Sequence, residues 1–401
     1  MNINNNDYLS FYHAGIIVLE DLPNLYNPSL YLFPFRYLPI SAFFFTPFSL
    51  LGLELGYFVF QIFNFFLNFL NLYLIYKIIK KYQTEYREIR FSYNCNNFKN
   101  IFINPENESI LHQNAIYLIM LPQFMNYFLG QINILVLFFT LGSFYFFLKE
   151  KKRYDFLGGL MLGCGILLKP TLLLLLPFII IINFNKKTRK FQIKFKQALL
   201  RLVSPLTLVL ISAFFFIIYP NMLNDFIYVN LAGRYTYNLG GELEINPSFS
   251  LTRILLIIFD IIGLKLNGFL VFFALLIIFF IPMYYYFVLY QKESHKLLIG
   301  YLSGYLIMLI VYFDSWPHHL VVLAPFLIIF IIIHEKFRKI KSIKLIHYLL
   351  SILMVVFWGI FFLTYEIFPI NLGGLILLII LYYYLIIYFV HNVDKNSEDF
   401  L

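Results

Sequence analysis

Charged residues are scarce in this chain. Asp, Glu, Lys and Arg make up only 13% of its 401 residues, whereas 61% are hydrophobic. So few polar side chains cannot cover the surface of a soluble domain of this length, which excludes an ordinary soluble protein. The long apolar runs indicate instead an all-α, polytopic integral membrane protein.

Cysteine is almost absent as well. Of the 2 cysteines, Cys95 falls in a polar stretch and Cys164 in an apolar run, so neither a disulfide framework nor a cysteine-based metal site follows. The chain opens with the polar residues 1–6, and we expect no cleavable signal peptide. No pattern in the sequence requires a metal or another cofactor.

The net charge of +9 could indicate a nucleic-acid partner, but the basic residues follow a membrane topology instead. Of the 30 Lys and Arg, 25 fall in loops that share one side, which the positive-inside rule makes cytoplasmic. We therefore expect about 11 membrane spans, with the N-terminus outside and the C-terminus inside. The expected spans cover residues 54–79, 110–128, 132–148, 155–168, 170–184, 198–219, 266–290, 297–313, 320–334, 345–365 and 372–390.

The chain is expected to form a single transmembrane domain over residues 1–401, with two large outer loops. The first loop, residues 1–53, is polar and irregular up to residue 36. An interfacial or re-entrant helix is expected at 37–51, because this apolar piece contains two prolines and is too short to cross comfortably. The second loop, residues 220–265, is polar and ends in a short surface helix that begins at Arg253.

Lys169 separates two apolar runs and is the most unusual charged residue of the chain. In the expected topology it emerges at the outer face together with Gln131 and Asn133. No residue close to it in the sequence can neutralise it, and an unpaired ammonium at the edge of hydrocarbon costs a few kcal/mol. An anionic partner or substrate on that face would offset the cost.

Further polar residues fall at span ends on the same expected face. A carboxylate there can take a proton from an incoming hydroxyl, and cations or imidazoles can stabilise charge on a leaving phosphate. This combination suits the transfer of a group from a lipid phosphate. The candidate residues are Asp7, Arg36, Gln131, Asn133, Lys169, Asn246, Ser248, Arg253, Asp314, His318 and His319.

Five short motifs carry a family resemblance. They are Asp7-Tyr8 with Leu25-Tyr26-Asn27-Pro28 and Phe35-Arg36-Tyr37-Leu38-Pro39, then Gly130-Gln131-Ile132-Asn133, Gly158-Gly159 to Lys169-Pro170, Asn246-Pro247-Ser248, and Ser315-Trp316-Pro317-His318-His319. In this order they resemble glycosyltransferase family 87, the polyprenyl-phosphate-mannose-dependent α-mannosyltransferases of the GT-C fold. The resemblance extends from Asp7 to about Pro325. The chain departs from the family pattern in lacking the usual first span, in lacking a double proline after Arg36, and in having Pro after Asn246.

The resemblance implies an inverting hexosyltransferase of the plasma membrane, with its active site on the extracytoplasmic side. The donor would be a polyprenyl-phosphate-linked sugar, mannose above all, and the acceptor a glycan or glycolipid. Asp7 is implied as the general base. Lys169, one histidine of the 318–319 pair and Arg253 would hold the leaving phosphate. Gln131, Asn133, Asn246, Ser248 and Arg36 are further candidates for binding the donor phosphate or substrate.

Two other functions share many of these features. A lipid-linked oligosaccharide polymerase or ligase would have the same fold and an outer-face site, but it would transfer an oligosaccharide. A lipid-linked sugar transporter or flippase is the non-enzyme alternative. Such a protein more usually shows polar residues in mid-span and a repeated half, whereas here the charges fall at span ends and no repeat is visible.

Overall fold

The computed structural model describes residues 6–86, 117–118, 120–185, 190–231, 248–264, 266–290, 293–333 and 372–398. Most of these residues are helical, as the sequence predicted. The α-helices are α1 (Tyr8–Glu20), α2 (Ile40–Ser49), α3 (Leu53–Tyr86), α6 (Leu121–Leu129), α7 (Asn133–Phe147), α8 (Lys152–Leu168), α9 (Leu176–Ile179), α10 (Phe195–Ile218), α11 (Pro220–Leu231), α12 (Leu251–Ile261), α13 (Gly268–Leu289), α14 (Glu293–Val311), α15 (Ala324–Ile333) and α18 (Leu372–Glu398). Short 3₁₀ helices are η2 (Leu22–Asn24), η3 (Pro28–Leu30), η4 (Pro170–Leu175) and η5 (Pro317–Val321). Strands β1 (Ile182–Asn185) and β2 (Lys190–Ile193) pair in an antiparallel hairpin.

Among the described residues, α3, α10 and α13 are long and apolar enough to cross a membrane. Shorter apolar helices of 10–17 residues accompany them. Helices also occupy the expected spans at 132–148, 155–168, 297–313, 320–334 and 372–390. The expected span at 345–365, the basic stretch after residue 335 and much of the span at 110–128 lie outside the described residues, so the number of spans stays a prediction.

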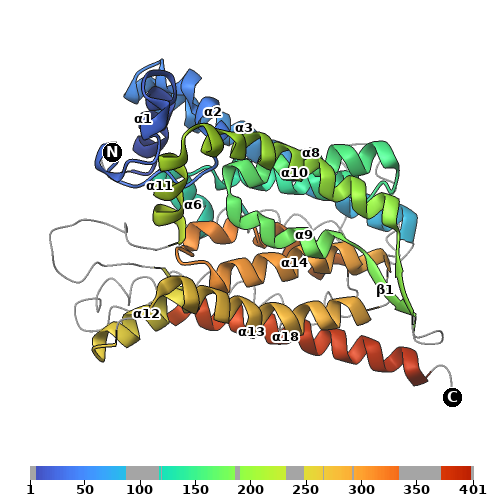
Figure 1. Ribbon diagram of the computed structural model, residues 1–401. Helices are drawn as coiled ribbons and strands as arrows, with labels where there is room; N and C mark the ends of the chain where they lie inside the picture. Colours follow the sequence, from blue (N-terminus) through green and yellow to red (C-terminus); the bar gives the residue numbers. More distant parts are fainter. Residues whose placement is uncertain are drawn as a thin grey trace.

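The long helices lie roughly parallel to one another (Figure 1). α8 packs between α7 and α10, while α14 packs against α13 and α18. Helices α1, α6 and α11 gather at one end of this bundle, and β1 marks the opposite end. We call the first of these the cavity end, because the cavity described below lies there.

The prediction that residues 1–36 are irregular was wrong. Residues 8–20 form α1, whose side chains Tyr8, Phe11, Ala14 and Val18 are buried on one face. Phe11 stacks on Phe45 of α2, with ring centroids 4.5 Å apart. The three- and four-residue spacing of these side chains places them on one face of a helix. The asparagines before this segment and the prolines after it had suggested irregular structure instead.

The expected span at 170–184 is not a continuous helix. It consists of η4, the single turn of α9, and then β1. Pro170 and Pro177 interrupt regular helical hydrogen bonding, and the isoleucine-rich sequence that follows favours a strand. At the usual rises of ~2.0, ~1.5 and ~3.3 Å per residue, these three elements have a contour of roughly 30 Å. A helix of the same residues would reach only about 20 Å.

A row of amide side chains on α3 fixes the junction between α6 and α7. Gln61 Nε2 donates to the Tyr127 carbonyl at 2.7 Å, and Asn71 Nδ2 donates to the Ile134 carbonyl at 3.1 Å. Such inter-helix hydrogen bonds hold helices together where apolar packing alone gives little specificity. The junction that they hold carries Gln131 and Asn133, two of the predicted site residues.

Candidate active site

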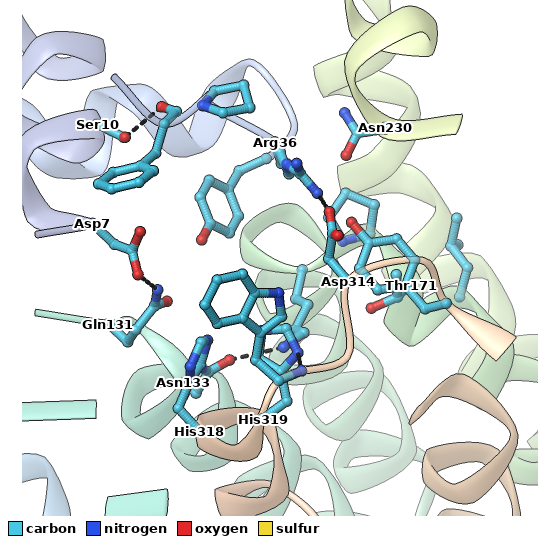
Figure 2. A pocket seen from close by; sticks show the side chains of 18 of the residues that line it. Asp7, Ser10, Arg36, Gln131, Asn133, Thr171, Asn230, Asp314, His318 and His319 are labelled. Carbon is cyan, nitrogen blue, oxygen red and sulfur yellow. Dashed lines mark hydrogen bonds and ion pairs between the residues drawn. The ribbon is translucent and has the colours of Figure 1, made fainter. Parts of the chain in front are cut away.

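A cavity of about 460 Å³ lies at the cavity end of the bundle, and several elements contribute to its walls. Eight of the eleven candidate residues line it: Asp7, Arg36, Gln131, Asn133, Lys169, Asp314, His318 and His319. In Figure 2, Asp7 and Gln131 lie on one side, Arg36 and Asp314 lie on the other, and Asn133, His318 and His319 lie between them. These residues come from the start of α1, the segment between η3 and α2, the α6–α7 junction, the end of α8, the loop before η5, and η5 itself.

Asp7 is held at the start of α1 by the end of α6. Its backbone N–H donates to the Leu129 carbonyl at 3.1 Å, and Gln131 Nε2 donates to its carboxylate. Burial raises the pKa of Asp7 to about 6, although the Gln131 hydrogen bond and the Arg36 charge act in the opposite direction. A carboxylate with a pKa this close to neutral can accept a proton from a hydroxyl and release it again.

Gly130 explains why Gln131 reaches Asp7. It ends α6 in the left-handed region, at φ +63°, and a Cβ there would lie 2.8 Å from Tyr8 Cβ. The turn lets the Gln131 N–H return to the Asn126 carbonyl at 2.8 Å. Only glycine adopts this conformation freely and also leaves room for Tyr8, so Gly130 sets the direction of Gln131.

Lys169 occupies the break between α8 and η4, where Pro170 prevents the helix from continuing. Its side chain is only 6% exposed, and Nζ donates to Asn133 Oδ1 at 2.8 Å. No carboxylate of the described residues forms an ion pair with it. Burial lowers the pKa of Lys169 to about 7, so the amine stands near the midpoint of its titration at neutral pH.

The two histidines of η5 have different environments. The Trp316 N–H donates to His319 Nδ1 at 3.3 Å, so neutral His319 carries its proton on Nε2. His318 is 3% exposed, and its Nδ1 has no hydrogen-bond partner within the described part of the chain. Burial and the nearby Lys169 charge hold the pKa of both imidazoles well below the usual range. Both rings are therefore neutral at neutral pH.

Asp314 forms ion pairs with two arginines from distant parts of the sequence. Arg36, which lines the cavity, pairs with one carboxylate oxygen, and Arg253 Nη2 lies 3.3 Å from the other. Arg253 does not line the cavity, so its link to the cavity runs through Asp314. The carboxylate thus fixes Arg36 in place and joins the segment between η3 and α2 to α12.

The structure locates the remaining two predicted residues differently. Ser248 is buried beside the loop that precedes η5, where its Oγ donates to the Phe313 carbonyl at 2.8 Å and accepts from the Ser315 N–H at 3.0 Å. It supports that loop and does not line the cavity. Asn246 lies outside the described residues.

Sequence reasoning missed other residues of the site. Asn230 lines the cavity from α11, a segment that the sequence predicted to belong to the second polar loop. Asn126, on α6, is buried behind the cavity and donates to the carbonyl of His318 at 2.8 Å. Its position seven residues before Asn133 is the only signal that could have indicated a link between them. Further lining residues without a sequence signal are Ser10, Tyr37, Thr171 and Trp316.

One wall of the cavity is apolar. It is formed by the side chains Leu173, Leu174, Phe226, Phe272, Phe273 and Leu276. An amphiphile with an anionic head and an apolar tail would match these two kinds of lining. Within the described residues, no group of three or more His, Cys, Asp or Glu side chains is arranged to hold a metal ion.

The sequence was also compared with known proteins. A model of glycosyltransferase family 87 matches residues 35–312, well over half of the chain. Asp7, His318 and His319 lie outside the matched segment, whereas Arg36, Gln131, Asn133 and Lys169 lie inside it. Comparisons with curated proteins and with solved structures gave no match.

Proposed function

Because this chain belongs to glycosyltransferase family 87, we propose that it transfers a hexose, which we take to be mannose, from a polyprenyl-phosphate-linked donor to a glycan or glycolipid acceptor. The protein is a membrane glycosyltransferase, and the donor, the acceptor and the mechanism are our proposal. We place the cavity end on the extracytoplasmic side of the plasma membrane, since the positive-inside bias assigns Lys169 to that face.

One observation carries this proposal: a carboxylate of raised pKa and an unneutralised lysine line the same cavity. Asp7 can act as a base while Lys169 remains able to bind an anion, because no ion pair joins the two. A purely structural acid and base in such a small space would be expected to neutralise each other. The apolar wall next to Lys169 suits the lipid tail of the donor.

The reaction would proceed by direct displacement. Asp7 takes the proton of the acceptor hydroxyl, and the freed oxygen attacks the anomeric carbon from the face opposite the phosphate. The bond between that carbon and the phosphate oxygen breaks, so polyprenyl phosphate leaves and the sugar inverts. Lys169, the His319 Nε2–H and Arg36 stabilise the charge that develops on the phosphate, a contribution worth several kcal/mol in a site with little water.

The test is Asp7→Asn, assayed with a lipid-linked mannose donor and a panel of glycan and glycolipid acceptors. Loss of the base should lower kcat by roughly 100- to 10,000-fold with little change in donor binding. Asp21→Asn is the matched control, because Asp21 is an exposed carboxylate of the same outer loop. If Asp7→Asn turns over at the wild-type rate, the base assignment is wrong.

Product length separates the proposal from the polymerase or ligase alternative. A mannosyltransferase extends a short acceptor by one sugar, whereas a polymerase or ligase adds a whole oligosaccharide. Mass analysis of the products formed on a defined short acceptor distinguishes the two. The transporter alternative loses support because the matched family consists of glycosyltransferases.

A further inference from the structure

A chain of buried amide groups links η5 to Lys169. It starts at Asn126, which is fully buried and whose Nδ2 donates to the Pro122 carbonyl at 2.7 Å and to the His318 carbonyl at 2.8 Å. Asn133 Nδ2 donates to Asn126 Oδ1 at 3.0 Å, and Lys169 Nζ donates to Asn133 Oδ1 at 2.8 Å. Asn126 itself does not line the cavity.

The donor and acceptor of every hydrogen bond in this chain of amides are fixed by its first member, Asn126. A backbone carbonyl can only accept, so the two carbonyls force Asn126 to turn its NH₂ toward them. Its oxygen must then face Asn133, which in turn must direct its own NH₂ at that oxygen. The amide oxygen of Asn133 is left facing Lys169, and a reversed Asn133 would place two donors against each other.

We propose that Asn126 is a positioning residue of the transferase: through Asn133 it presents a fixed acceptor oxygen to the Lys169 amine and so holds that amine as a donor toward the cavity. This inference rests on the proposed role of Lys169 in binding the donor phosphate. The amide chain favours the ammonium form, because an ammonium donates all its protons, whereas a neutral amine also offers a lone pair that Asn133 Oδ1 cannot use.

The charge state of Lys169 is sensitive to this contact because the site supplies little else to fix it. Its pKa of about 7 reflects burial, and no carboxylate of the described residues pairs with it. The titratable and charged groups that share its cavity are Asp7, Arg36, Tyr37, Tyr312, Asp314, His318 and His319. Both imidazoles are held neutral by burial and by Lys169 itself, so they add no counter-charge.

The test measures the titration of Lys169 in the full-length protein in lipid nanodiscs. Lysine is isotopically labelled at Cε, and the Lys169 resonance is identified by its loss in Lys169→Arg. In Asn126→Leu, Asn133 can rotate and offer its NH₂ to the neutral amine. The pKa of Lys169 should then fall by about one unit. Simple loosening of the site would instead admit water and raise the pKa toward its ordinary value.

Two further variants protect this test against misfolding and general loosening. Asn126→Ser keeps an intrahelical hydrogen bond to the Pro122 carbonyl but is too short to reach Asn133, so it should lower the pKa as Asn126→Leu does. Ser143→Ala removes a fully buried hydroxyl of α7 that shares a hydrogen bond with the Tyr301 hydroxyl at 2.7 Å and does not line the cavity, and it should leave the Lys169 titration unchanged. A Lys169 pKa in Asn126→Ser equal to or above the wild-type value overturns the proposal.

This measurement stands apart from the transfer assay. A lowered Lys169 pKa in a protein that transfers no sugar would uphold the amide chain and reject the proposed function. Sugar transfer by a protein whose Lys169 pKa is the same in Asn126→Ser as in wild type would uphold the proposed function and reject the amide chain. In an active enzyme, the alkaline limb of the pH profile should fall together with the Lys169 pKa in Asn126→Ser.

Discussion

The pKa values of Asp7 and Lys169 predict a narrow, bell-shaped dependence of kcat/KM on pH. Asp7 must be ionised to accept a proton, so activity should rise as pH increases through about 6. Lys169 must be protonated to bind phosphate, so activity should fall as pH increases through about 7. Both histidines titrate well below their usual range and should not contribute to the alkaline limb.

The magnitude follows from the separation of the two pKa values. At the maximum, near pH 6.5, roughly 60% of the free enzyme would carry both groups in the correct form. At pH 8.5 about 3% of Lys169 would remain protonated, so kcat/KM should be roughly 20-fold lower than at the maximum. The profile of kcat should differ, because a bound phosphate beside Lys169 raises its pKa back toward the ordinary 10.5. The alkaline loss should therefore appear as a rising KM.

The assay is a pH series at constant ionic strength with a lipid-linked mannose donor, comparing wild type with Lys169→Arg. Arginine stays charged throughout this range, so the alkaline limb should disappear while the acid limb of Asp7 remains. A limb near pH 7 that persists in Lys169→Arg would refute the assignment, because another group would then be titrating. An alkaline limb at the same pH in kcat and kcat/KM would refute the proposed contact with the donor phosphate.

Three further predictions concern single substitutions. In Asn133→Asp the new carboxylate should pair with Lys169 and move the alkaline limb of kcat/KM up by about one to three pH units. It should also raise KM for the donor, because the ammonium would already be neutralised. An alkaline limb at the wild-type pH would contradict the contact between residue 133 and Lys169. Asp314→Asn should release both arginines and lower the free energy of unfolding by roughly 1–3 kcal/mol, as measured by thermal unfolding in detergent. An unchanged Tm would mean that the two ion pairs do not contribute to stability. Gly130→Ala should be destabilised by more than ~2 kcal/mol in the same measurement, through its positive φ and its contact with Tyr8. Gly52→Ala, at φ +82° in open space, isolates the backbone strain, so equal losses in the two variants would rule out the steric part.

The sequence alone predicted which site residues lie at helix ends, because the lengths of the apolar runs fix those ends. Lys169 could be placed at a helix end because apolar runs of fixed length flank it, and the same argument placed Gln131 and Asn133 beside it. The ion pair between Arg36 and Asp314 could not be predicted, because nothing in the pattern relates two loops so far apart in the chain. Pairing of that kind depends on how α1, α12 and η5 pack, which a hydropathy pattern does not encode.

Helix assignments were missed where a helix adjoins polar or proline-containing sequence. The face of α1 that carries Tyr8 and Phe11 is short, and asparagines before it suggested an irregular segment. In the same way α11, which contributes Asn230 to the cavity, lies in a stretch whose composition resembles a loop. Both helices owe their stability to contacts with other elements, and local propensity is a weak guide in such cases.

The two amides of the α6–α7 junction explain how the site keeps an acid and a base active in one small space. Gln131 offers its NH₂ to Asp7, and Asn133 offers its oxygen to Lys169, so each ionisable group is satisfied by a neutral partner of matching polarity. A charged partner would draw either pKa far from neutral. With neutral partners, burial alone sets the direction of each shift, upward for the acid and downward for the amine. The pKa of Asp7 therefore rises toward neutral pH and the pKa of Lys169 falls toward it. Such values suit a proton acceptor and a phosphate-binding cation that share one cavity.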